Sequence, residues 1–240
     1  MLRNMIWRFR RRILLAVSVL AVAAVCVYVG DFERVEQVGK INATSVLLQG
    51  YILVDAGHGM PDPGASAADG TQESVINLEI AKPLRDLLVL LGYDVRMTRE
   101  GDYGIYDDHV TSIRDKKISD MRNRLEQYNK AAVVVSIHQN VFTQTQYSGT
   151  QVFYSGGNVA GKPLAGAVQQ SVRELLQPKN IREIKKGGSG IYLLHNTTAP
   201  AVLVECGFLS NPAECVKLKE AAYQRQMALA IGVGVVTGMQ

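Results

Sequence analysis

From residue 51 to the end of the chain, short apolar runs alternate with longer stretches in which apolar residues recur at helical spacing. The apolar runs predict strands at 51–55, 93–98, 131–138, 150–155, 190–195 and 201–206. The periodic stretches predict helices at 73–91, 112–130, 162–177 and 213–237. Pro83 lies inside the first of these helices, where we expect it to cause a kink.

The predicted strands are too apolar to leave one face of a sheet in water; residues 133–140, for example, read "VVVSIHQN". Strands of this kind, alternating with helices, are typical of a sheet that is covered on both sides. We therefore predict an α/β fold with a single twisted, mostly parallel sheet of about six strands and helices on both faces.

The first 30 residues have a different pattern. Five arginines (Arg3, Arg8, Arg10, Arg11 and Arg12) precede "ILLAVSVLAVAAVCVYVG", which spans residues 13–30 and carries no charge over 18 positions. A run of this length is about enough to cross a bilayer, and flanking arginines hold their end in the cytoplasm. No small-x-small cleavage site follows it, which favours an uncleaved anchor over a signal peptide. We expect a transmembrane helix, with the rest of the chain outside the cytoplasm, or secreted if the segment is cleaved.

Residues 31–49 are polar and poorly periodic, which predicts a tether between the anchor and one folded domain at 50–240. The net charge of +4 comes from the N-terminal arginines, because the other 228 residues hold 21 basic and 22 acidic side chains. The folded domain therefore offers no basic face of the kind that nucleic acids require. Three cysteines do not form a disulfide framework, and we interpret Cys206 and Cys215 as small buried apolar residues.

Titratable residues gather where the predicted strands end. His58 follows the first strand within "AGHGMPDPGA", His138 closes the third strand, and Glu205 closes the last. Glu73 begins the helix that follows the first strand's loop. A lone histidine in such a place is more often a hydrogen-bonded core residue than a ligand. In open α/β sheets, however, ligands bind at the carboxyl ends of the strands, so we expect these four side chains to converge there.

Two imidazoles and two carboxylates suit a hydrolytic metal site. Catalytic zinc takes three nitrogen or oxygen ligands and keeps a fourth position for water. His58, Glu73 and His138 match that set, which leaves Glu205 to transfer protons. Two histidines and one carboxylate are also the ligands of non-haem iron, so the ligand count leaves iron open. "GHGMPD" is no dinucleotide fingerprint, because Asp62 stands where the third glycine belongs.

Four segments carry a resemblance to a known family: "ILVDAGHGMPDPGA", the helix that opens with Glu73, "VVVSIHQN" and "AVLVECGFLSN". Together they resemble the zinc-dependent N-acetylmuramoyl-L-alanine amidases of the amidase-3 family over roughly residues 50–238. An anchor with one catalytic domain, and "SIRDKKISDMRNRL" before the third strand, is similar to the family's spore-cortex members. Ala56 and Met60 depart from the family's usual proline and glycine, and His195 from a frequent arginine.

The resemblance implies a function and a role for each residue. His58, Glu73 and His138 match the zinc ligands of the family, and Glu205 matches its catalytic glutamate. The implied reaction is hydrolysis of the amide between N-acetylmuramic acid and L-alanine in peptidoglycan, in spore cortex before a separate deacetylase allows muramic δ-lactam to form. The alternatives are a zinc peptidase or deacetylase acting on the wall, and a non-catalytic wall-binding domain. We also expect an accessory activating protein as a possible partner, because the sequence shows no separate wall-binding module.

Overall fold

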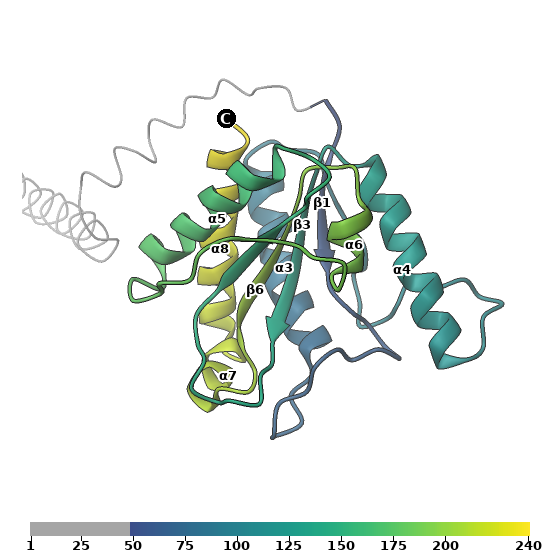
Figure 1. Ribbon diagram of the computed structural model, residues 1–240, viewed down its shortest axis with the longest axis horizontal. Helices are drawn as coiled ribbons and strands as arrows, with labels where there is room; N and C mark the ends of the chain where they lie inside the picture. The colour runs from purple at the N-terminus through teal and green to yellow at the C-terminus, as the bar shows by residue number, and fades with distance from the viewer. Residues whose placement is uncertain (1–48) are drawn as a thin grey trace, which may run out of the picture. The chain divides into compact units, whose positions relative to one another are not determined.

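In the computed structural model, which describes residues 49–240, one mixed sheet forms the centre of this part of the chain (Figure 1). Its strands lie in the order β2-β1-β3-β6-β4-β5. The four strands from β2 to β6 run parallel, and β4 runs antiparallel to β6. The strands are β1 (Ile52–Ala56), β2 (Val95–Met97), β3 (Val133–Asn140), β4 (Gln151–Tyr154), β5 (Lys185–Lys186) and β6 (Ala201–Phe208).

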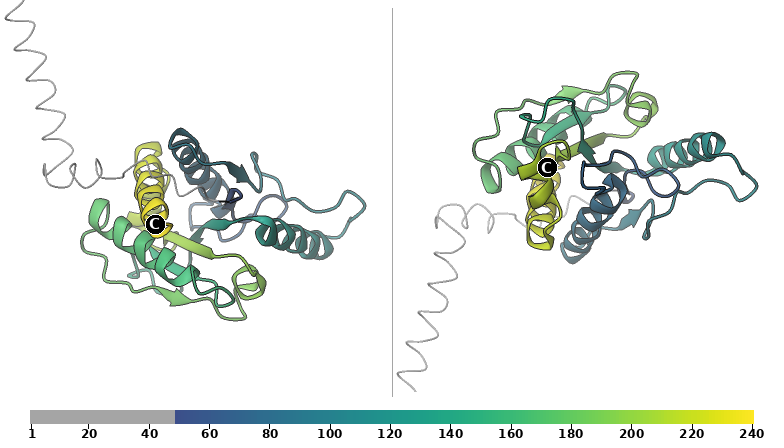
Figure 2. Two further views of the ribbon diagram at one scale, coloured as in Figure 1. Left: turned by 90° about the horizontal axis from the view of Figure 1, so that it is seen from above. Right: turned by 90° about the horizontal axis from the view of Figure 1, so that it is seen from below.

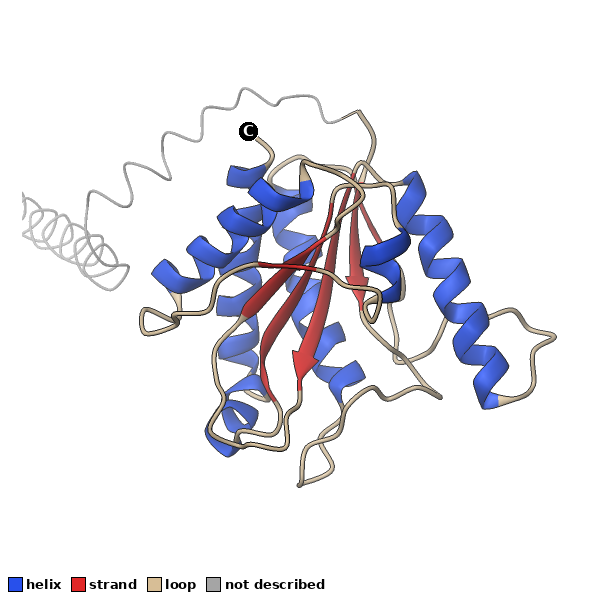
Figure 3. Ribbon diagram, in the orientation of Figure 1, coloured by secondary structure: helices blue, strands red, loops and turns tan. Residues whose placement is uncertain are grey.

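Helices cover both faces of the sheet, as Figure 3 shows. On one face lie α3 (Glu73–Leu90), α5 (Gly161–Leu175) and α8 (Ala221–Gly238), with α3 and α8 side by side (Figure 2). The other face carries α4 (Ile113–Lys130) and the short helix α6 (Tyr192–Asn196). The remaining helix, α7 (Pro212–Leu218), lies between β6 and α8 in the chain. The predicted α/β architecture is confirmed.

Side chains alternate along the central strands and divide the core in two. In β6, Val202 and Val204 belong to the cluster beneath α3, α5 and α8, whereas Ala201 and Leu203 belong to the cluster beneath α4 and α6. Because successive strand residues point to opposite faces, Glu205 lies on the same face as Leu203. This places Glu205 on the α4 and α6 face of the sheet.

One predicted strand is wrong. The run at 190–195 contributes to α6 instead, and the sixth strand is β5 at the sheet edge, which lies outside every predicted strand. Leu193 and Leu194 are consecutive and both buried in the same cluster, which a helix permits and an alternating strand does not. A short apolar run cannot by itself distinguish these two conformations.

The other elements differ in their limits, and one predicted helix is divided in two. The helix expected at 213–237 is two helices, and the Asn211 side chain caps the first by accepting hydrogen bonds from the Ala213 and Glu214 amides. Helix α3 continues past Pro83 to Leu90. Both cysteines of the described part, Cys206 and Cys215, are free and buried, as predicted.

The predicted anchor at 1–30 and tether at 31–49 lie, apart from residue 49, outside the described residues. Between residues 49 and 240, no helix has the length and apolar character needed to cross a membrane.

Candidate metal centre and active site

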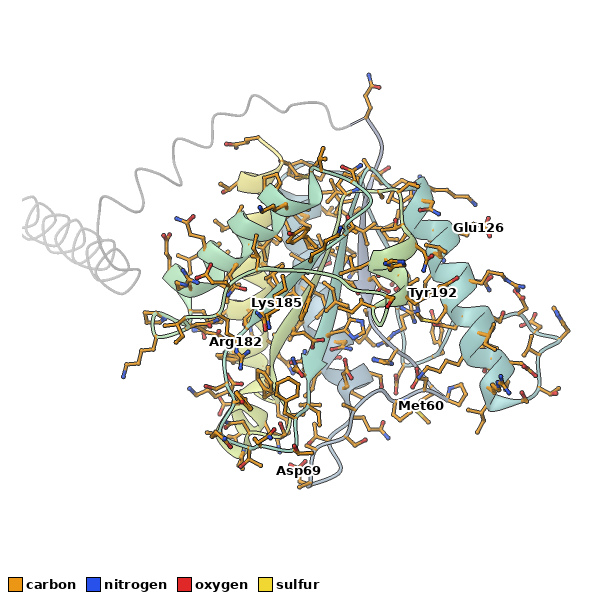
Figure 4. All side chains as sticks on the ribbon, in the orientation of Figure 1. Met60, Asp69, Glu126, Arg182, Lys185 and Tyr192 are labelled. Atoms are coloured by element: carbon orange, nitrogen blue, oxygen red, sulfur yellow. The ribbon has the colours of Figure 1, made fainter. Side chains whose placement is uncertain are left out.

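His58, Glu73 and His138 meet at the carboxyl edge of the parallel strands, as the sequence predicts. One nitrogen from each histidine and one oxygen from Glu73 all lie within 4.8 Å of one another. The loops after β1 run beneath this edge, where Figure 4 labels Met60 and Asp69. Three elements distant in sequence thus bring together a set of donor atoms that can hold a metal ion.

The turn that carries His58 has an unusual backbone that is fixed by two buried arginines. His58 itself adopts a left-handed conformation, with φ of 63°, which costs a non-glycine residue about 1–2 kcal/mol. The Ala56 carbonyl accepts from Arg99 Nε at 2.9 Å and from Arg124 Nη1 at 3.0 Å. Arg99 Nη2 donates to the Gly57 carbonyl at 3.0 Å, and Arg124 Nη2 to the His58 carbonyl at 2.6 Å. Such an arrangement holds the strained turn in place.

Gly57 allows the His138 ring to approach this turn. A Cβ atom at position 57 would lie only 2.2 Å from His138 Nε2, so any larger residue would displace the imidazole. The rings of His58 and His138 are edge to face, with centroids 5.0 Å apart.

Both carboxylate oxygens of Glu73 are fixed by backbone amides and face the histidines. Oε1 accepts from the Gln139 amide at 3.0 Å and lies 2.9 Å from His138 Nδ1. Oε2 accepts from the Ala65 amide at 2.8 Å and lies 3.4 Å from His58 Nε2. Burial opposes the charge on Glu73, but the two histidines outweigh it and hold its pKa well below the usual range. Glu73 is therefore an ionised carboxylate, the form that can bind a metal ion.

Asp62 orients the His58 ring. Its Oδ2 lies 3.0 Å from His58 Nδ1, and Lys117 Nζ of α4 lies 3.2 Å from the same oxygen. Burial lowers the pKa of His58, but hydrogen bonds and charge from Asp62 and Glu73 outweigh it and raise that pKa to about 9. With Nδ1 occupied by Asp62, the nitrogen left to bind a metal is Nε2.

The Asp55 carboxylate, near the end of β1, pairs with Arg124 and accepts hydrogen bonds from the hydroxyls of Tyr128 (2.5 Å) and Ser136 (2.6 Å). This buried network holds α4 against the sheet. Sequence reasoning missed Asp62, Arg99 and Arg124; the position of Asp62, four residues after His58 in a glycine-rich turn, is the signal that could have found it.

Glu205 lies opposite His138 on the neighbouring strand β6. The sequence predicts that His138 and Glu205 are the last residues of their strands. In the structure β3 continues for two residues beyond His138 and β6 for three residues beyond Glu205. Burial, reinforced by the charge of Glu73 and opposed by the histidines, raises the pKa of Glu205 to about 7. Its buried Oε2 has no hydrogen-bond partner in the described structure. A carboxyl group of this kind can take up and release a proton near neutral pH.

Comparison with known proteins identifies the family to which this chain belongs. Residues 52–237 match the family model described as N-acetylmuramoyl-L-alanine amidase. The chain belongs to that family. The germination-specific N-acetylmuramoyl-L-alanine amidase of Bacillus subtilis is 36% identical over 194 residues, which cover 80% of this chain and 81% of that protein.

Two further relatives support the assignment. The structure of the CwlD amidase from Clostridioides difficile, solved in complex with the GerS lipoprotein, superposes with a TM-score of 0.76 at 39% identity. That match covers 79% of this chain and 98% of the CwlD chain. The amidase AmiA of Escherichia coli is 28% identical over 78% of this chain and 75% of its own length. The predicted enzyme class, an amidase acting on peptidoglycan, is confirmed.

Proposed function

We propose that this amidase is a zinc enzyme that hydrolyses the bond between N-acetylmuramic acid and L-alanine, with His58, Glu73 and His138 as metal ligands and Glu205 as the catalytic residue. The observation that carries the proposal is the convergence of the three donor atoms within 4.8 Å. A buried carboxyl group, Glu205, lies in the strand position next to His138. Two imidazoles and a carboxylate are ligands that zinc accepts in catalytic sites.

Each of these residues has a separate task. Bound zinc supplies a Lewis acid that polarises a carbonyl and makes water a stronger nucleophile near neutral pH. His58 and Glu73 are held by Asp62 and by backbone amides, so the ligand set is ready before substrate binds. Glu205 removes a proton from the attacking water and then delivers it to the leaving amine nitrogen of L-alanine. Burial raises its pKa to about 7 in the metal-free protein, which favours a group that exchanges protons near neutral pH.

Product analysis tests the proposed reaction. Full-length protein with zinc is incubated with muramoyl peptides, and the products are identified by mass spectrometry. An amidase releases an intact stem peptide that begins with L-alanine, whereas a peptidase yields a shortened peptide and a deacetylase releases acetate. Removal of the metal by a chelator stops the reaction and zinc restores it. Full turnover by demonstrably metal-free protein contradicts the proposal.

We propose spore cortex as the substrate, before muramic δ-lactam forms. The support is similarity to a relative named germination-specific and to CwlD. Deletion of the gene from an endospore-forming host is expected to leave a cortex without δ-lactam. Normal δ-lactam content in such spores excludes this role.

We propose that residues 1–30 anchor the enzyme in the membrane and that residues 31–49 form a tether. The catalytic domain at 50–240 then lies outside the cytoplasm. The support is the block of five arginines before 18 uncharged residues. N-terminal sequencing of the membrane fraction from the native host tests this. A mature protein that begins after residue 23 and is found in the soluble fraction identifies the segment as a cleaved signal peptide.

We propose an accessory protein as a partner of this amidase. The support is that the related CwlD was solved in complex with the GerS lipoprotein. Activity of the purified enzyme on cortex-type peptidoglycan is compared with activity in extracts of sporulating cells. Equal specific activity excludes an obligatory partner.

A further inference from the structure

Asn77 is a fully buried amide on α3, one helical turn after Glu73. Residues four apart lie on the same face of a helix, so the Asn77 side chain points to the same edge of the sheet as the Glu73 carboxylate. Its side chain makes three hydrogen bonds. Nδ2 donates to the Gly57 carbonyl at 3.0 Å and to Glu73 Oε1 at 3.3 Å, and Oδ1 accepts from Gln139 Nε2 at 3.1 Å.

Each of these bonds reaches one of the three segments that carry the proposed metal ligands. Gly57 precedes His58, Glu73 is itself a ligand, and Gln139 follows His138. The orientation of the amide follows from its partners, since the Gly57 carbonyl can only accept and must face the NH2 group. Asn77 thus joins the turn after β1, the start of α3 and the end of β3 through one rigid side chain.

Other hydrogen bonds near the site join fewer segments. The Gln139 amide connects β3 to Glu73, and the Ala65 amide connects the loop before α3 to the same carboxylate. Arg99 fixes the turn after β1 to the start of α3 through Gly57 and Ser74, without reaching β3. Among these contacts, Asn77 alone touches all three ligand segments.

We propose that Asn77 is a positioning residue that sets the mutual placement of His58, Glu73 and His138, and with it the geometry and affinity of the metal site. This inference rests on the proposed function, because it assumes that these three side chains hold zinc. A purely structural asparagine would stabilise the fold without any effect on the metal. The two roles differ in metal affinity and in the spectrum of the bound metal.

The experiment compares Asn77→Leu with a matched control in the full-length protein. Leucine keeps a similar volume and removes all three hydrogen bonds. Gln224→Leu is the control, because Gln224 is a buried amide on α8 whose Nε2 donates to the Leu218 carbonyl, away from the ligands. Zinc affinity is measured by competition with a chromogenic chelator, and the visible absorption spectrum of Co²⁺-loaded protein reports the ligand geometry. Folding of each variant is checked by circular dichroism.

We expect Asn77→Leu to weaken zinc binding by about 10–100-fold, the usual effect of losing a residue that orients metal ligands. Its cobalt spectrum should shift, whereas Gln224→Leu should keep the affinity and spectrum of the wild type. If Asn77→Leu does not fold, Gln139→Met removes the bond to Asn77 while keeping the backbone amide on Glu73, and should change both readouts in the same direction.

A folded variant, Asn77→Leu or its substitute, that binds zinc with unchanged affinity and an unchanged cobalt spectrum overturns the inference. Failure of the wild-type protein to bind zinc at all is a different result. That outcome rejects the proposed metal function itself.

Discussion

His138 and Glu205 occupy directly opposed positions on the parallel strands β3 and β6. Opposed residues on neighbouring strands point to the same face of a sheet, so the His138 imidazole, which faces Glu73, lies beside the Glu205 carboxyl group, whose buried Oε2 has no hydrogen-bond partner among residues 49–240. In the proposed function, His138 is a metal ligand and Glu205 transfers protons. The two glutamates near His138 therefore differ in environment, and this difference is testable.

Substitution of Glu205 by glutamine should remove activity but not metal. Glutamine keeps the size of the side chain and cannot accept the proton, so we expect kcat to fall by roughly 10²–10⁴. Zinc content, measured by atomic absorption, should stay at the level of the wild type, because Glu205 is not among the three grouped donors.

Glu73→Gln is the counterpart of that variant. It should lose both zinc and activity, because an amide oxygen is a weaker ligand than the ionised carboxylate that faces both histidines. If Glu205→Gln empties the metal site while Glu73→Gln retains zinc, the roles are reversed. A lower Tm with normal turnover per folded molecule would make Glu205 a structural residue.

Zinc affinity should depend steeply on pH below about 9, the pKa to which Asp62 and Glu73 raise His58 in the metal-free protein. Histidine binds metal only when neutral, so zinc competes with a proton. We expect the Kd for zinc to rise about tenfold for each unit by which pH falls below this value. Isothermal titration in buffers between pH 7 and 9 measures it, and a Kd independent of pH over that range contradicts the assignment.

Whereas zinc affinity should increase with pH, the folding stability of the metal-free protein should decrease as pH rises. The folded-state pKa of His58 lies above its ordinary value of 6.5, so its contribution is complete below pH 6.5 and is lost as pH rises through about 9. The pKa of Glu205 is also raised, so its contribution to stability is lost as pH rises from 4.5 to about 7. Zinc should therefore raise the Tm more at pH 9 than at pH 7, which thermal denaturation with and without metal measures.

Asp62→Asn should lower the pKa of His58 and weaken zinc binding. Asparagine keeps the volume and a hydrogen-bond acceptor but removes the charge that favours the imidazolium. NMR titration of the metal-free variant should show the His58 pKa moving towards 6.5, and zinc affinity at high pH should fall by roughly tenfold. Lys117→Met, which removes the lysine paired with Asp62, is the control and should leave the His58 ring oriented. An unchanged His58 pKa in Asp62→Asn would show that Asp62 does not control this ring.

Arg124→Met should destabilise the fold strongly, because it leaves Asp55 charged and fully buried without its partner. Removal of one partner of a buried ion pair costs about 3–5 kcal/mol. Arg122→Met is the matched control two positions away on α4, where an exposed arginine pairs with Asp107 and the expected cost is only about 0–1 kcal/mol. Urea denaturation measures both, and equal costs would show that the Asp55 pair is not a buried one in solution.

The sequence shows why most of the fold can be predicted. Apolar runs such as 133–140 and the helical periodicity over 73–91 depend on local spacing, which is fixed by the pitch of a helix and the alternation of a strand. The four candidate site residues, His58, Glu73, His138 and Glu205, could be expected near one another because the carboxyl ends of parallel strands share one edge of the sheet. The run at 190–195 could not be assigned, because Leu193 and Leu194 fit a helix or a strand until the surface they pack against is known.

Other features depend on contacts between segments distant in sequence. Arg124 lies in a helix with a highly charged sequence, which suggests a position in solvent. It is nevertheless buried, because its guanidinium donates a hydrogen bond to the carboxylate of Asp55, sixty-nine positions earlier. Asn77 carries no sequence pattern that distinguishes it from an ordinary polar residue of a helix, and Asp62 is marked only by its position four residues after His58 in a glycine-rich turn. Their roles follow from the partners that the turn after β1 brings to them.

The sequence by itself determined the α/β class, the family and the four candidate site residues, because each is encoded in local spacing or in short motifs. Only the tertiary structure decided how those residues are held: which carboxylate faces the histidines, which one keeps a raised pKa, and which buried amide and guanidinium groups fix the His58 turn. The physical reason is that burial and hydrogen bonding are properties of an assembled environment. They arise between residues such as Glu205 and His138 or Asn77 and Gly57, whose separation along the chain gives no indication of their distance in space.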